Sequence, residues 1–230
     1  QERFFFRWTA YDGHILRLAV PALGSLAAGP LYVLVDTAIV GHLGTTPLAG
    51  LALAGVLIDG ALALCGFLQY ATTAHAGRQH GAGQAETMKS IAAQSLWLPT
   101  AIGLFLIALG LTTGPFALGL LGGTGEVVGL AGVYLRIALL GLPFALIANA
   151  GEGYLRGLAD LRTPLFFIVG GNILNVILEL AFVYGLGWGL AGSAWATVIA
   201  QAAMGAGFIV RLWQASAGAR RPRLLAMKPL

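Results

Sequence analysis

Six apolar stretches, each long enough to cross a lipid bilayer, constrain this chain more than any other feature. A spanning helix needs about 20 apolar residues, and only 10% of the 230 residues are charged while 58% are hydrophobic. Soluble domains carry roughly 25% charged residues. The sequence therefore predicts an all-α integral membrane protein, a single six-helix transmembrane bundle. The expected spans are residues 15–40, 48–74, 90–111, 127–150, 165–184 and 190–213.

The segments outside these spans also have a recognisable composition. Residues 1–13 mix aromatic and charged side chains, which is typical of a segment lying at the membrane interface. Residues 214–230 form a basic tail. All Lys and Arg residues except Arg136 lie near the termini or in the connections between spans two and three and between spans four and five. The positive-inside rule then predicts that both termini are cytoplasmic. The net charge of +4 thus indicates orientation rather than nucleic-acid binding.

Asp36 stands inside the first apolar stretch. A central Asp disfavours membrane insertion by roughly 2.5 to 3.5 kcal/mol. Such an acid is usually retained because it faces a water-filled cavity and binds a cation or a proton. We therefore asked which other polar side chains share its depth.

Three further polar residues fall at a similar depth, by the rise of about 1.5 Å per residue. Glu179 lies six residues before the turn that follows span five, and Asn175 lies one helical turn earlier on the same face. Thr197 lies eight residues into span six. Two carboxylates with amide and hydroxyl oxygens suit Na⁺, and two close carboxylates cannot both ionise cheaply, which suits a proton carrier. The alternative is that backbone groups or Arg136 satisfy each acid.

Other residues in the spans have less certain partners. Asp59, near the middle of span two, either joins the same cavity or pairs with Arg136. Tyr32 lies one turn before Asp36 and either packs there or contacts a substrate. Pro21 and Pro30 each remove a backbone hydrogen bond from span one, which should make this helix kinked or bendable.

Enzyme signatures are missing from the sequence. There is no His-Glu-x-x-His motif, no Walker motif and no metal-ligand spacing among the four histidines. We therefore predict that the protein is not an enzyme and uses no cofactor, apart from H⁺ or Na⁺ as a coupling ion.

Five sequence segments resemble the multidrug and toxic compound extrusion (MATE) family, in its DNA-damage-inducible F-type branch. The resemblance covers nearly the whole chain. It is carried by Pro30-Leu-Tyr-Val-Leu-Val-Asp-Thr-Ala-Ile-Val-Gly-His-Leu-Gly44, Tyr70-Ala-Thr-Thr-Ala74 with Arg78 and Gly81-Ala-Gly83, Tyr154-Leu-Arg-Gly-Leu-Ala-Asp-Leu-Arg-Thr-Pro164, Asn172-Ile-Leu-Asn-Val-Ile-Leu-Glu-Leu180, and Gly192-Ser-Ala-Trp-Ala-Thr-Val-Ile-Ala-Gln201.

The resemblance implies a secondary antiporter of a bacterial cytoplasmic (inner) membrane that exports cationic or amphipathic compounds in exchange for H⁺ or Na⁺. The cation site of the family maps onto Asp36, Asn175, Glu179 and Thr197, with the backbone carbonyl of Ser193 added. Tyr32, Asp59 and Arg136 would line the substrate path, and Pro21 falls where the first helix of the family bends.

Two departures from the family pattern matter. Glu179 stands where this branch typically has Asp, and the chain holds one lobe where the family has two. The resemblance therefore implies an amino-terminal half, with residues 214–230 similar to an inter-lobe linker and a second lobe as partner. Two alternatives stay open: a flippase of the related lipid and polysaccharide exporters, and a non-transporting half that only binds a partner.

Overall fold

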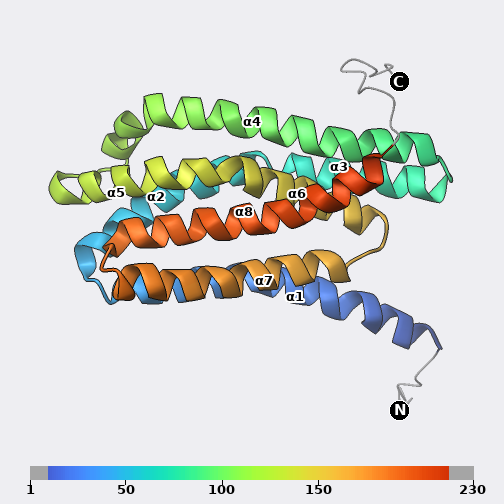
Figure 1. Cartoon of the computed structure of the whole chain (residues 1–230), viewed down its shortest axis with the longest axis horizontal. Coiled ribbons are helices and arrows are strands. Elements are labelled where there is room, and N and C mark those ends of the chain that lie inside the picture. The colour runs from blue at the N-terminus through green and yellow to red at the C-terminus, as the bar shows by residue number, and fades with distance from the viewer. Residues whose placement is uncertain (1–9, 218–230) are drawn as a thin grey trace, which may run out of the picture.

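The computed structural model describes residues 10–217, and its long elements are all helices (Figure 1). The predicted interfacial segment up to residue 9 and the tail from residue 218 lie outside the described residues. Six helical units in the described part are long and apolar enough to cross a membrane, which confirms the predicted six-helix bundle. These units are Ala19–Gly41, Thr45–Gly81, Ala85–Leu120, Gly125–Gly157, Arg162–Gly185 and Gly189–Ser216.

Eight α-helices and two short elements make up these units. The α-helices are α1 (Ala10–Gly41), α2 (Thr45–Leu64), α3 (Phe67–Gly81), α4 (Ala85–Leu120), α5 (Gly125–Ala138), α6 (Leu142–Gly157), α7 (Arg162–Glu179) and α8 (Gly189–Ser216). A 3-10 turn, η1 (Leu139–Gly141), joins α5 to α6, and a π-helix, η2 (Leu180–Gly185), follows α7.

The helices extend beyond the apolar stretches that predicted them. At 1.5 Å per residue α4 is about 54 Å long, whereas a hydrocarbon core is about 30 Å thick. The polar segment between spans two and three is therefore mostly helical, and only residues 82–84 separate α3 from α4. Hydropathy marks the embedded part of a helix only.

The polar start of α4 also carries an ion pair at helical spacing, from Lys89 to Glu86 at 2.8 Å.

Two of the spans are interrupted, and apolar composition alone does not reveal either break. Span two breaks between α2 and α3, where the N–H of Gly66 bonds the carbonyl of Ala63 at 3.0 Å, one residue short of the α-helical partner. Span four tightens at η1, directly before Pro143. Proline has no N–H to donate to the carbonyl four residues back, and this favours the tighter turn there.

The spans pack side by side with both ends of the described chain on one side (Figure 1). In that view α1 and α7 run along one edge, α4 runs along the opposite edge, and α6 and α8 lie between them. We call the end that holds the first and last described residues the terminal end. The opposite end, with connections at 42–44, 121–124 and 186–188, is the distal end.

A close approach at Gly192 fixes the relation of α8 to the end of span five. A Cβ atom at Gly192 would lie 2.9 Å from the backbone carbon of Phe182 in η2. No side chain fits there without displacing backbone, so glycine lets α8 lie against η2. The next residue, Ser193, is thereby brought close to Glu179, the last residue of α7.

Candidate functional site

Asp36 points into the bundle although most of its helix faces outward. Its side chain is 7% exposed, while the neighbouring Leu34 is 65% exposed. The hydroxyl of Ser193 on α8 donates a hydrogen bond to Oδ1 of Asp36 at 3.0 Å. The acid of the first span is therefore directed toward α8 and away from lipid.

Glu179 is fully buried at the junction of α7 with the π-helix η2. Its carboxyl group lies close to the Asp36 carboxyl and to the Ser193 hydroxyl. Neither Glu179 oxygen accepts a hydrogen bond from a donor in the described structure. Single π-helical turns are rare and often occur at functional sites. Here the turn directly follows the residue whose oxygens need a cation or a proton.

Thr197 connects the acids to two more polar side chains. Its hydroxyl donates to the Ser193 carbonyl at 3.0 Å. Because that single proton is used, Thr197 can only accept from its other neighbours. Tyr32 on α1 therefore donates to Thr197 at 3.1 Å, and the amide of Asn175 donates to it at 3.3 Å. The Asn175 side-chain oxygen is then left buried without a donor.

The structure thus brings five predicted site residues and Tyr32 into one group. We call Asp36, Ser193, Glu179, Asn175, Thr197 and Tyr32 the acid-pair site. No ion pair in the described residues involves either acid, and no third Asp, Glu, His or Cys completes a metal cluster with them there. Buried carboxylate, amide and hydroxyl oxygens without a basic partner can hold a proton or a hard monovalent cation.

Tyr134 belongs to this region and the sequence analysis missed it. It lies on α5, is 6% exposed, and its hydroxyl lies close to Thr197. Its position nine residues into α5 gives a depth of about 14 Å from the distal end. The depth argument used for Thr197 would have found it had aromatic hydroxyls been considered. From the same span the sequence analysis chose Arg136.

Arg136 and Asp59 lie outside the acid-pair site. Both are exposed on the surface of the described bundle, and no ion pair joins them. Asp59 is near enough to Asp36 for their charges to interact. Their assignment to the substrate path stays a prediction. Pro21 and Pro30 both lie inside α1, as predicted, and the hydroxyl of Ser25 bonds the Pro21 carbonyl at 3.1 Å.

Two further hydrogen bonds hold α1 against span five. The amide of Asn172 donates to the Ala28 carbonyl at 3.0 Å, and the hydroxyl of Tyr184 donates to the Ile39 carbonyl at 2.7 Å. Both use backbone acceptors, one on each side of the segment that carries Asp36. The position of that acid therefore depends on neutral anchors as well as on its own contacts.

Fold and site together define a multi-pass helical membrane protein with a buried, unneutralised pair of acids. The chain belongs to the MatE family, whose sequence pattern matches residues 21–183. It is 33% identical over 194 residues to the DNA damage-inducible protein F of Escherichia coli K12, covering 84% of this chain and 42% of that protein.

Solved structures agree with this assignment. An outward-facing multidrug resistance MATE family transporter of the MOP superfamily matches with a TM-score of 0.82 and 29% identity, over 94% of this chain and 48% of that chain. A MATE protein crystallised in a bent conformation matches with a TM-score of 0.79 and 31% identity, over 84% and 43%. The chain therefore spans less than half the length of these relatives.

Proposed function

We propose that this chain is the cation-binding lobe of a secondary antiporter that exports cationic or amphipathic small molecules in exchange for H⁺ or Na⁺. The observation that carries the proposal is the acid pair. Asp36 and Glu179 are buried side by side, no basic residue among residues 10–217 forms an ion pair with them, and both Glu179 oxygens lack a donor there. Two adjacent buried carboxylates are unfavourable until a cation or a proton neutralises them.

Loading of the acid pair would change the shape of α1. Neutralisation removes the repulsion between Asp36 on α1 and Glu179 on α7, so it favours close contact of the two helices. Pro21 and Pro30 remove two backbone hydrogen bonds from α1, which lowers the cost of bending it. A family member crystallised in a bent conformation supports such a movement. The ion-loaded and the substrate-bound forms are then alternative states of one lobe.

Transport needs a second lobe and a defined orientation. Alternating access in secondary transporters moves one repeat against another, and this chain spans less than half of its relatives. We infer that the carboxy-terminal half of a longer chain, or another half-chain, completes the transporter. The basic residues at the terminal end favour the cytoplasmic side of a bacterial inner membrane for that end. The distal end, and with it the acid-pair site, then lies toward the outside.

Proteoliposomes with imposed gradients test this proposal. The two-lobed protein is reconstituted, ethidium is the substrate, and a pH or a Na⁺ gradient is applied separately. We expect one of the two gradients to drive ethidium uphill. Transport that is indifferent to both gradients contradicts antiport. A native mass measurement in lipid is the companion experiment, because a strict monomer of this chain alone that still transports would contradict the need for a second lobe.

A further inference from the structure

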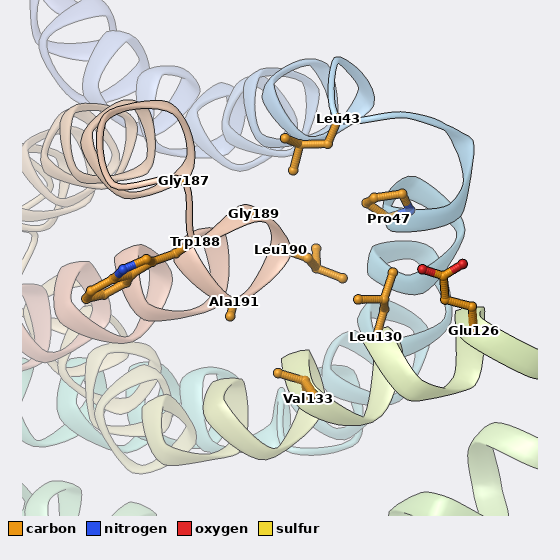
Figure 2. A pocket seen from close by; sticks show the side chains of 10 residues that line it. All are labelled: Leu43, Pro47, Glu126, Leu130, Val133, Gly187, Trp188, Gly189, Leu190 and Ala191. Atoms are coloured by element: carbon orange, nitrogen blue, oxygen red, sulfur yellow. The ribbon is translucent and has the colours of Figure 1, made fainter.

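A cavity of about 340 Å³ opens at the distal end of the bundle (Figure 2). None of the residues that line it belongs to the acid-pair site. Its walls come from three places: the α1–α2 connection with the first turn of α2, the helix α5, and the turn that leads into α8 with the start of that helix. Figure 2 shows Leu43, Pro47, Leu130 and Leu190 around the hollow, with the Glu126 carboxylate at one side. The Trp188 indole points away from Glu126 and packs on Phe182 at a ring distance of 5.2 Å.

The cavity lies directly outward of the acid-pair site. On α8 and on α5, a residue of the cavity wall precedes a buried polar residue by about one helical turn, and residues three or four apart share a helix face. On α8 Leu190 precedes Ser193, and on α5 Leu130 precedes Tyr134. On α1 the chain passes from Asp36 through Val40 to the cavity wall at Leu43.

A thin apolar layer separates the cavity from the site. Val40, Ala131 and Ala194 are 0% exposed, Leu190 is 4% exposed, and all four belong to one packed cluster. We call them the apolar floor. A Cβ atom on Gly50 would lie 3.2 Å from both Leu130 and Leu190, so both leucines pack closely against α2. Apolar constrictions of this kind can block ions by excluding water until they widen.

Glu126 gives the cavity its charge. The three distal connections contain no Lys or Arg, and Glu126 is the second residue of α5, just after the connection at 121–124. It is exposed and lines the cavity. Its place in the first turn of α5 also suits the helix dipole, but that role does not require a cavity beside it. A lone carboxylate at the mouth of a recess with apolar walls raises the local concentration of cations.

We propose that this cavity is the vestibule through which the coupling cation reaches the acid-pair site from the distal side, with Glu126 attracting the cation and the apolar floor acting as the gate. The proposal rests on the proposed function, because it assigns a route to the ion of that antiport. Its occupant is a hydrated monovalent cation, either Na⁺ or hydronium. The gate opens when Leu190 moves away from the other residues of the apolar floor.

Thiol chemistry measures the charge of the vestibule without transport. In a Cys65→Ala background, a cysteine is placed at Ala191 in the cavity wall, or at the exposed Leu120 of α4 as control. Cationic and anionic methanethiosulfonates of similar size are applied from the distal side, each rate being normalised to that with a free thiol. We expect the cationic reagent to react roughly three- to tenfold faster at position 191, and Glu126→Gln to remove this preference. Glu126→Asp should keep it.

Carboxyl labelling tests the route itself. A water-soluble carbodiimide with a membrane-impermeant amine is applied from the distal side, and peptide mass spectrometry quantifies labelled Asp36. A bulky thiol reagent is first attached to the cysteine at position 191 or at position 120. We expect the adduct at position 191 to slow the labelling of Asp36 about fivefold or more, while the same adduct at position 120 leaves the rate unchanged. Three results would overturn the proposal. They are a complete lack of label on Asp36, the same labelling rate with the adduct at position 191 as with the adduct at position 120, and the same reaction rate of the thiol at position 191 with both reagents. A vestibule confirmed without gradient-driven efflux would instead contradict antiport.

Discussion

Two groups of buried acids in this bundle are held in opposite ways. Near the terminal end, Glu152 on α6 is 8% exposed and both of its oxygens are satisfied. Gln69 on α3 donates to Oε2 at 2.7 Å, and Arg156 forms an ion pair with Oε1. In the acid-pair site, Asp36 and Glu179 are buried to a similar degree but have no basic partner.

The difference separates a structural acid from an exchangeable one. Glu152 joins α3 to α6 and needs nothing from outside, because the positive charge is built into the chain. The acid pair lacks that charge, so burial there costs stability, and under the proposed function an external cation or proton offsets this cost. Burial alone does not mark a functional carboxylate. The informative feature is a buried acid whose neutralising charge must come from solution.

The largest expected effect comes from Asp36→Asn in the two-lobed transporter. Asparagine keeps the size of the side chain but cannot bind a proton or balance a cation, so gradient-driven ethidium efflux should fall at least about tenfold. Glu152→Gln is the matched control, since it changes an acid of similar burial that already has its partners. Efflux per folded molecule should stay near wild type in that control. If both variants lose efflux equally, the distinction between the two acids is wrong.

Removing the positive charge of Arg156 should destabilise the helices at the terminal end. Arg156→Met leaves Glu152 buried without its charge partner. Breaking a buried pair costs about 3 to 5 kcal/mol, and because the Arg156 side chain is 26% exposed we expect a loss of about 2 kcal/mol in the free energy of unfolding. Denaturant titration in detergent measures it. Arg162→Met, at an exposed arginine, should change stability by less than about 0.5 kcal/mol.

The same substitution should act with opposite sign at the two acids. Glu179→Gln removes one of two adjacent carboxylates and supplies an amide that can donate to Asp36, so unfolding free energy should rise by about 1 kcal/mol. Glu152→Gln weakens the pair with Arg156 and should lower it by about 1 kcal/mol. Thermal unfolding with and without the coupling ion adds a second reading, because the Glu179 variant should lose ion-dependent stabilisation. Destabilisation by Glu179→Gln would contradict this account.

The depth of a residue below the membrane surface was predictable from sequence, whereas the direction in which its side chain points from the helix axis was not. Asp36, Asn175, Glu179 and Thr197 were chosen because rise per residue places them in one layer, and the structure brings them together. Their roles stay predictions. On span four the sequence analysis singled out Arg136, which is exposed, and passed over Tyr134, which is buried. Neighbouring residues on a helix differ by about 100° in direction, and an apolar span gives little sign of which face is inward.

Six spans followed from composition, but their interruptions depend on local backbone chemistry. Pro143 offered a signal for the 3-10 turn before it, since proline withholds a backbone donor. The break at Gly66 offered a weaker one, because glycine is frequent throughout this chain. The π-helix after Glu179 had no signal that we can identify. Glu152 was missed because it lies close to the terminal end, where acids are not unusual.

The smallest expected effect tests how Asp36, which has no basic partner in the described structure, is held in position. Tyr184→Phe deletes the hydroxyl that bonds the Ile39 carbonyl, and because Tyr184 is half exposed the free energy of unfolding should fall by only about 0.5 kcal/mol. Tyr70→Phe, at a tyrosine that is 73% exposed, should leave it unchanged. If Asp36 depends on neutral anchors, Tyr184→Phe should also weaken ion-dependent stabilisation while Tyr70→Phe does not. An unchanged ion response in Tyr184→Phe would mean that Ser193 alone holds the acid in place.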